Sequence, residues 1–304
     1  MGEPAIKFRH LHAFIEVARL KSVVKAAGFL NVSQPAVTKT IRELEDALGV
    51  TLVEREGRGI RLSRYGEVFL KHAGAATAAL RHGIDSVSHE RLREAPLIRV
   101  GALPTVSSRI MPRAMNLFLK ERMGSRVKIV SGENSVLLEQ LRFGELDLVV
   151  GRLADADKMA GFTFEHLYSE QVVFAVRAKH PILSSNDSLF SQLSLYPVLM
   201  PSTGSIIRPF VDRLLIANGI SGIPSQIETI SDSFGRAFVL TSDAIWIISS
   251  GVVLRDIQNG LIQRLPIDTS DTQGPVGLTM RTDVVPSIAM SFLLQTIREA
   301  ASHP

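Results

Sequence analysis

The N-terminal part of the chain contains two short helical patterns separated by a tight turn. Ser22 can cap the first pattern, residues 23–30, because its hydroxyl can accept a hydrogen bond from a first-turn backbone N–H. Ser33 can cap the second pattern in the same way, and Pro35 falls in its first turn, where a missing N–H costs nothing. Gly49 follows the second pattern, and glycine commonly ends a helix at this position. The sequence therefore predicts two helices joined by a turn.

Helical periodicity extends this unit. Residues 8–20 carry apolar side chains at spacings of three and four, which predicts a preceding amphipathic helix. In the helix after the turn, the inward side should consist of apolar residues at 4-3-4 spacing, Val37, Ile41, Leu44 and Leu48. The opposite side presents Gln34, Thr38, Lys39 and Arg42. Side chains of these types can reach base edges and phosphates from a helix in the major groove.

Residues 51–62 are typical of a β-hairpin, with two short strands on either side of Gly57-Arg58-Gly59. Arginines recur along the hairpin and just after it: Arg55, Arg58, Arg61 and Arg64. A helix-turn-helix followed by such a hairpin is a winged helix-turn-helix, which binds duplex DNA. His10 and His12 of the first helix are expected at its surface.

The distribution of charge supports this interpretation. The chain has 304 residues, and at roughly 100–200 residues per domain two or three domains are expected. It contains 34 Lys and Arg and 30 Asp and Glu, of which residues 1–95 hold 15 and 11. The whole positive excess therefore lies in the first third, which suggests a polyanion-binding module joined to a neutral body.

The segment AAGFLNVSQPAVTKTIRELEDALGVTLVEREGRGIRLSRYG, residues 26–66, closely resembles the DNA-binding region of LysR-type transcriptional regulators. Domain order and length match that family along the whole chain. The resemblance implies an N-terminal all-α winged helix-turn-helix domain, a long linker helix and a C-terminal effector-binding domain. We predict that DNA is contacted by Ser33, Gln34, Pro35, Thr38, Lys39, Arg42, Arg55 and Arg58.

The linker helix is expected over residues 64–88, which contain no proline. Six residues there recur at the a/d spacing of a coiled coil: Phe69, Ala73, Ala76, Leu80, Gly83 and Val87. A dimer through this helix would place two DNA-binding heads on two half-sites, whereas the alternative is a helix packed on its own domain. The resemblance implies such homodimers, usually paired into tetramers. We place domain boundaries at 1–64, 65–90 and 91–304, with a hinge at 91–96.

Strand and helix patterns alternate through the rest of the chain, which argues α/β architecture with parallel sheets. The predicted elements include strands at 97–103, 126–131 and 146–150, helices at 110–122 and 135–143, a second set between 171 and 249, a strand at 276–281 and a helix at 286–301. In the resembled family such a region forms a two-subdomain, periplasmic-binding-protein-like clamp around an effector. Subdomain I should span about 97–165 and 267–304 and subdomain II about 166–266, with the second crossing near 265–268.

Three hydroxyl-rich loops follow predicted strands, at 103–108, 132–135 and 201–205. Sites in α/β sheets lie beyond the carboxyl ends of strands, where hydroxyl groups and backbone N–H groups suit an anionic ligand. Arg152, after the third strand, can pair with a carboxylate as a bidentate fork. We predict that a small carboxylate is held by Thr105, Ser107, Asn134, Arg152, Ser202 and Thr203. The alternative is that these residues are ordinary helix caps and a solvated arginine.

Within the family, the segments IKFRHLHAFIEVAR, VGALPTVSSRIMP and VGRLADADKMAGF resemble regulators of protocatechuate catabolism. This implies an activator of aromatic-acid catabolic genes with carboxy-cis,cis-muconate as coinducer, acting on promoter DNA and RNA polymerase. A repressor, or a regulator that responds to another small acid, is the nearer alternative. An enzyme or a solute-binding protein with a vestigial helical N-terminus is the more distant one.

Composition and motifs argue against other classes. The chain contains no cysteine, which excludes disulfides, thiolate metal sites and a cysteine nucleophile. Its apolar runs are shorter than the about 20 residues of a membrane span, and the N-terminus lacks a signal peptide, so we expect a cytoplasmic protein without membrane association. We find no nucleophile–base pair and no H-E-x-x-H arrangement, so we expect no enzymatic activity, metal or cofactor.

Overall fold

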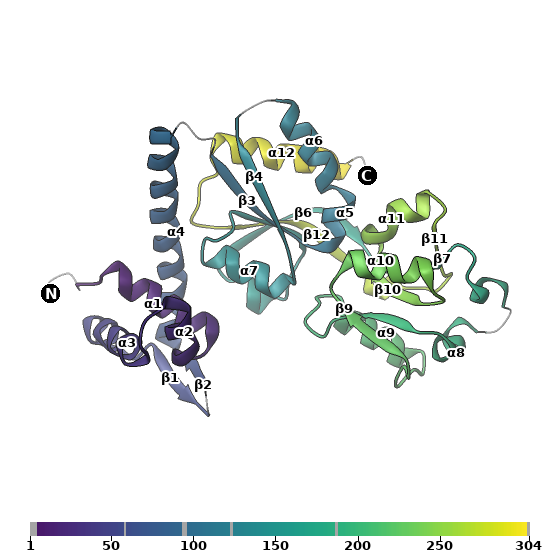
Figure 1. Ribbon diagram of the computed structural model, residues 1–304, viewed down its shortest axis with the longest axis horizontal. Coiled ribbons are helices and arrows are strands. Elements are labelled where there is room, and N and C mark those ends of the chain that lie inside the picture. The colour runs from purple at the N-terminus through teal and green to yellow at the C-terminus, as the bar shows by residue number, and fades with distance from the viewer. Residues whose placement is uncertain (1–4, 58, 93–95, 122–123, 186–187, 303–304) are drawn as a thin grey trace. The chain divides into compact units, whose positions relative to one another are not determined.

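The computed structural model describes residues 5–57, 59–92, 96–121, 124–185 and 188–302 of the chain. The chain divides into two compact units, coloured from purple to yellow along the sequence in Figure 1. The first unit contains residues 1–96 and 139–146, and the second contains residues 97–138 and 147–304. None of the helices among the described residues is both long and apolar enough to cross a membrane.

The first unit opens with the predicted helices, here α1 (Phe8–Leu20), α2 (Val23–Leu30) and α3 (Gln34–Leu48). The hydroxyl of Ser22 accepts a hydrogen bond from Lys25 N, and that of Ser33 accepts one from Ala36 N. Gly49 ends α3 with a φ of 69°, a left-handed conformation that favours glycine. Both helix starts and the end of the third helix are therefore confirmed.

A two-stranded hairpin and a long helix follow. Strand β1 (Val53–Glu56) pairs antiparallel with β2 (Gly59–Leu62), with Val53 opposite Leu62, and α4 (Arg64–Leu92) begins directly after. The core of the three-helix unit contains the predicted inward residues Val37, Ile41 and Leu44 of α3, together with Phe14, Val17, Ala26 and Ala27. Burying one such large apolar side chain contributes about 1.5–3 kcal/mol, so these faces hold α3 firmly on the unit.

The predicted coiled-coil seam of α4 is divided between two environments. Ala73 is buried, and Phe69 packs edge-on against Phe14 with ring centroids 5.4 Å apart, so the first turns belong to the core of the unit. Farther along, Leu80 and Val87 are exposed. Helix α4 runs through Leu92, beyond the predicted boundary at residue 90, and residues 93–95 of the predicted hinge lie outside the described residues.

In the second unit, one five-stranded sheet has the order β4-β3-β5-β12-β6. Its strands are β3 (Leu97–Ala102), β4 (Arg126–Ser131), β5 (Leu148–Arg152), β6 (Phe162–Glu170) and β12 (Gly274–Arg281). Its helices are α5 (Pro104–Arg109), α6 (Met111–Lys120), α12 (Ile288–Ser302) and, as far as residue 138, α7 (Asn134–Arg142). The single helix predicted over 110–122 is thus preceded by a separate short helix, which begins at Pro104, where proline fits a first turn.

The other sheet has the order β11-β7-β10-β8-β9. Its strands are β7 (Val172–Arg177), β8 (Val198–Pro201), β9 (Gln226–Thr229), β10 (Ile245–Ser249) and β11 (Ile262–Arg264). The helices α8 (Leu189–Gln192), α9 (Arg208–Ala217), α10 (Asp232–Thr241) and α11 (Ser250–Gln258) accompany it, as Figure 1 shows. The described part of this unit also contains four 3-10 helices: Ala156–Met159, Pro181–Ser184, Leu193–Leu195 and Ser270–Thr272.

The two sheets confirm an α/β clamp of two subdomains but differ from the prediction in direction. Strand β12 runs antiparallel to β5 and β6, and β7 runs antiparallel to β10 and β11, so both sheets are mixed. The prediction missed β6, a strand of mostly half-buried residues that carries the first subdomain to Glu170. The first crossing falls at Gln171, after β6, and the second lies between β11 and β12.

Candidate functional sites

The outer side of α3 carries the side chains that were predicted to contact DNA. Gln34, Pro35, Lys39 and Arg42 are exposed, as is the capping residue Ser33, and Thr38 is half-buried. The Thr38 hydroxyl donates a hydrogen bond of 3.0 Å to Gln34 O. Apolar burial of the opposite side fixes which way these polar residues face.

A groove of about 400 Å³ lies between α3 and the hairpin. Its lining includes Gln34, Thr38, Arg42 and Arg55, so the structure brings the predicted helix and wing residues together. Arg55 is exposed on β1, whereas Arg58 lies outside the described residues. The groove combines guanidinium groups with amide and hydroxyl groups, the mixture that suits phosphate and base contacts.

Glu45 ties the hairpin to α3. Its Oε1 accepts hydrogen bonds from the backbone N–H groups of Leu52 at 2.7 Å and Val53 at 3.1 Å. Helical periodicity gives no sign of this role, because the hydrogen bonds join Glu45 to residues beyond the end of its helix. A carboxylate that accepts two backbone N–H groups forms strong, charge-assisted hydrogen bonds, so it sets the position of the wing.

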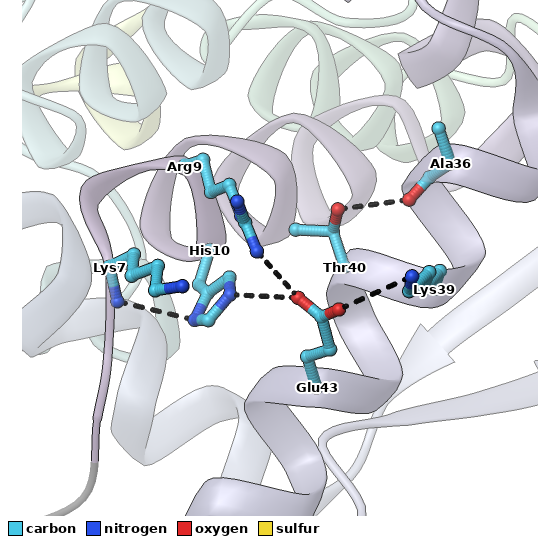
Figure 2. Close-up of polar contacts among 7 residues, drawn as sticks. All are labelled: Lys7, Arg9, His10, Ala36, Lys39, Thr40 and Glu43. Atoms are coloured by element: carbon cyan, nitrogen blue, oxygen red, sulfur yellow. Dashed lines mark hydrogen bonds and ion pairs between the residues drawn. The ribbon is translucent and has the colours of Figure 1, made fainter.

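Figure 2 shows a second carboxylate of α3, Glu43, surrounded by basic side chains. Its Oε2 accepts a hydrogen bond of 2.9 Å from Arg9 and lies 3.3 Å from His10 Nε2, and its Oε1 lies 3.9 Å from Lys39 Nζ. The hydrogen bond from Arg9 lowers the pKa of Glu43, more strongly than its partial burial raises it. Glu43 therefore stays ionised beside the exposed cations Arg9 and Lys39.

The prediction that His10 lies at the surface is wrong. His10 is 3% exposed, and its Nδ1 accepts a hydrogen bond of 3.2 Å from the backbone N–H of Lys7. That bond leaves Nε2 to carry the proton and to donate toward Glu43. The first residues of α1 are thereby linked to α3, a contact between segments that no local pattern reveals.

In the second unit, a cleft of about 500 Å³ lies between the two subdomains, at the ends of their strands. The first subdomain contributes Leu103, Pro104, Ser131, Gly132, Glu133 and Asn134. The second contributes Pro201, Ser205, Ile206, Thr229, Ile230, Ser231, Asp232, Ser233, Trp246 and Ile248. All three predicted loops thus reach this cleft, together with a fourth segment, residues 229–233, that was not predicted.

The polar lining of the cleft is hydroxyl-rich and contains two carboxyl groups, Glu133 and Asp232, but no basic residue among the described lining residues. Asp232 is the first residue of α10, which is capped by Ser231 through a hydrogen bond of 3.3 Å from Phe234 N. Burial raises the pKa of Asp232 to about 6. Asp232 therefore changes charge close to neutral pH.

Of the six predicted ligand residues, Asn134 alone belongs to the described lining of the cleft, and its Nδ2 donates a hydrogen bond of 3.3 Å to Arg152 O. Thr105 lies behind the lining, buried, and its hydroxyl donates a hydrogen bond of 2.7 Å to Glu170 Oε2. Ser107 lies near Ser131, with their oxygens 3.2 Å apart.

Arg152 is 3% exposed rather than solvated or open to the cleft. Its Nη2 donates a hydrogen bond to Thr272 O, and its guanidinium lies 4.8 Å from the centre of the Phe210 ring. Burial disfavours the charged forms of both groups: it lowers the pKa of Arg152 and raises the pKa of Glu170. Both groups lie beside the segments that cross between the sheets, and their contacts join the two subdomains.

The loop after β8 contains the other two predicted residues. Thr203 is exposed, and the hydroxyl of Ser202 donates a hydrogen bond of 2.7 Å to Glu133 Oε1 from the opposite subdomain. Sequence reasoning missed Glu133 and Asp232 as residues of the cleft. The segment TISDSFG, residues 229–235, carried a usable signal, because Ser231 is followed by an acidic first turn as at many helix starts. Among the described residues, no group of His, Asp or Glu is arranged to hold a metal ion.

Comparison with known proteins identifies relatives along the whole chain. A family model described as "LysR substrate binding domain" matches residues 92–302, and one described as "Bacterial regulatory helix-turn-helix protein, lysR family" matches residues 8–67. The HTH-type transcriptional regulator PcaQ of Agrobacterium fabrum is 66% identical over 303 residues, which cover 100% of this chain and 97% of that protein.

More distant similarities agree with this one. The uncharacterized HTH-type transcriptional regulator YdcI of Escherichia coli is 33% identical, with 97% of this chain and 96% of that protein covered. The solved structure of full-length LysG from Corynebacterium glutamicum with the bound effector Arg has a TM-score of 0.60 at 18% identity, covering 98% of both chains. At that identity the structural likeness concerns the fold alone.

Proposed function

The chain belongs to the LysR family of bacterial transcriptional regulators, and from this premise we propose that it activates genes of protocatechuate breakdown in response to a small carboxylate coinducer. The observation that carries the proposal is the 66% identity with PcaQ, which extends over the regions matched by both family models. Carboxy-cis,cis-muconate is the first coinducer to test.

In this proposal promoter DNA is bound by the eight residues Ser33, Gln34, Pro35, Thr38, Lys39, Arg42, Arg55 and Arg58. The exposed side of α3 and the groove shared with Arg55 support it, because they present phosphate-binding and base-reading groups on one surface. Because its target is promoter DNA, the regulator would act in the cytoplasm. The DNA-binding domain would span 1–64, the linker helix 65–90 and the effector-binding domain 91–304.

The effector is proposed to bind in the 500 Å³ cleft. Hydroxyl groups of Ser205, Thr229, Ser231 and Ser233, with Asn134 opposite, supply hydrogen-bond donors to carboxylate oxygens. Thr105 and Arg152 lie behind the lining. In this proposal they support the effector site through their hydrogen bonds at the crossings between the subdomains. LysG, which shares the fold, was solved with a small effector bound.

Regulation follows from thermodynamic coupling. An effector that binds one geometry of the clamp more tightly shifts the population toward that geometry. In a dimer through α4, paired into a tetramer, such a shift changes the spacing of the DNA-binding heads and hence the bend of the promoter. RNA polymerase would then be engaged when the effector is bound. The exposed apolar residues Leu80, Ile84 and Val87 of α4 support a helix that has a partner chain.

Nuclease footprinting of the intergenic DNA beside the protein's own gene tests the proposal, with and without carboxy-cis,cis-muconate. We expect a long protected region whose hypersensitive positions change with the compound. Protection that ignores the compound would retain the regulator and reject this coinducer. A lack of protection at every salt concentration would reject DNA binding and would favour an enzyme or a solute-binding protein.

A second candidate is a regulator of either sign that responds to a different, less charged acid. The two carboxyl groups and the absence of a basic residue among the described lining residues favour it, because each further negative charge on the ligand is repelled. Titrating the protein with mono-, di- and tricarboxylates distinguishes the candidates. The regulatory names of the relatives support regulation rather than catalysis.

A further inference from the structure

A carboxylate of the chain itself lies on the loop that was expected to receive a ligand. Glu133, between β4 and α7, reaches from the first subdomain to the loop after β8 in the second. There its Oε1 accepts the hydrogen bond of 2.7 Å from the Ser202 hydroxyl. Glu133 belongs to the first subdomain and Ser202 to the second, so this hydrogen bond joins the two sides of the cleft within one compact unit.

Gly204 provides the space in which this carboxylate lies. A Cβ atom added at Gly204 would lie 2.3 Å from Glu133 Oε2 and 2.9 Å from Oε1. Both carboxylate oxygens therefore lie against the glycine, and any larger residue there would displace them. Together, a hydroxyl donor and a glycine without a side chain form a small seat for a carboxylate.

The position of Glu133 also sets the charge of the cleft. Glu133 and Asp232 are the titratable residues among the described lining, and no basic residue there offsets them. A ligand carboxylate that entered this seat would meet the negative charge of Glu133 at close range. The Glu133 carboxylate and the ligand carboxylate therefore cannot share the seat, because two like charges in contact repel strongly.

We propose that Glu133 occupies the carboxylate subsite of the effector cleft, and that a small-acid effector binds there by displacing it. The inference rests on the proposed function that the cleft binds a small acid. A ligand carboxylate takes over the Ser202 hydroxyl, and the hydrogen bond between the subdomains is exchanged for one to the ligand. Occupation of the subsite is thereby coupled to the contact that joins the two sides of the clamp.

The test compares carboxylate binding by the full-length wild type, Glu133→Gln and Glu133→Ala. Trp246 is the single tryptophan of the chain and lines the cleft, so its fluorescence reports binding. Carboxy-cis,cis-muconate should bind about tenfold more tightly to Glu133→Ala, with Glu133→Gln between this variant and the wild type, since the competing charge is removed. Glu299→Gln, an exposed acid on α12, is the matched control and should change nothing.

A double variant locates the gain at the same seat. In Glu133→Ala/Gly204→Ala the new methyl group fills the space that the carboxylate used, so the tighter binding should be lost. The backbone at Gly204 has no left-handed φ, which makes alanine compatible with the loop. Thermal unfolding of each variant without ligand verifies that it is folded.

Binding of succinate tests the carboxylate subsite independently of which acid is the coinducer. At millimolar concentration succinate should quench or shift the fluorescence of Glu133→Ala and raise its Tm, with a much smaller effect on the wild type. If the wild type ignores carboxy-cis,cis-muconate while the variant binds succinate, the subsite stands and the coinducer is rejected. Equal or weaker binding of both acids by Glu133→Ala would overturn the inference.

Discussion

Glu45 of α3 accepts a hydrogen bond of 2.7 Å from the backbone N–H of Leu52, the residue that leads into the wing. A second bond, from Val53, ends on the same carboxylate oxygen. The recognition helix thus holds the hairpin by two backbone groups, and Arg55 is placed relative to Arg42 by this connection.

Replacing Glu45 by alanine should therefore loosen the wing. The N–H of Leu52 belongs to a residue that is 1% exposed, and an unpaired buried N–H costs about 1–3 kcal/mol. We expect a loss of unfolding free energy in this range, together with weaker DNA binding, measured by urea unfolding and by fluorescence anisotropy. Glu45→Gln keeps a neutral acceptor and should recover part of both. Unchanged stability of the alanine variant would contradict the anchoring role.

Arg42 is predicted to contact phosphate. Its replacement by alanine should weaken binding to all DNA sequences, because phosphate contacts carry no base information. The slope of log affinity against log salt concentration should decrease by about 1, the effect of one lost counterion-releasing contact. Filter binding on operator and random DNA between two salt concentrations measures this slope. A loss confined to the operator would instead assign Arg42 to a base edge.

Glu43 should restrain DNA binding. The hydrogen bond from Arg9 keeps its pKa low, so a full negative charge lies near Arg9 and Lys39 at neutral pH. In Glu43→Gln both cations are freed to meet phosphate, and we expect about two- to fivefold tighter binding at low salt. Glu67→Gln, an exposed acid on α4, is the control. Weaker binding in the Glu43 variant would mean that the carboxylate positions these cations for DNA.

Asp232 should make stability depend on pH. Burial raises its pKa from 3.8 to about 6, so its charged form is less favourable in the folded chain than in the unfolded chain. The resulting destabilisation develops as pH rises from about 4 to about 6 and is constant above this range. The shift alone corresponds to about 3 kcal/mol, and solvent screening of this partly exposed carboxyl group reduces the expected effect to about 1–2 kcal/mol. Asp232→Asn should raise the Tm at pH 8 more than at pH 4.5. An equal change at both pH values would refute the shifted pKa.

Local sequence patterns determined where the helices of the DNA-binding domain begin and end, and which side of α3 faces outward. Ser22, Ser33 and Gly49 delimit helices through bonds to their own neighbours, and the 4-3-4 spacing of apolar residues orients α3. Such interactions act within a few residues, so they can be read from the sequence. The alternation of strands and helices likewise predicted α/β architecture, whereas the two-subdomain clamp and the return to the first subdomain near residue 265 were implied by the family resemblance.

Contacts between distant segments were decided only by the tertiary structure. Thr105 and Arg152 have the chemistry of ligand residues, yet packing directs them to Glu170 and Thr272 behind the cleft. Glu133 reaches Ser202, 69 residues farther along the chain, because the two subdomains meet at the cleft. Sequence determined which side chains each element offers, whereas the association of the subdomains decided which of them remain available to a ligand.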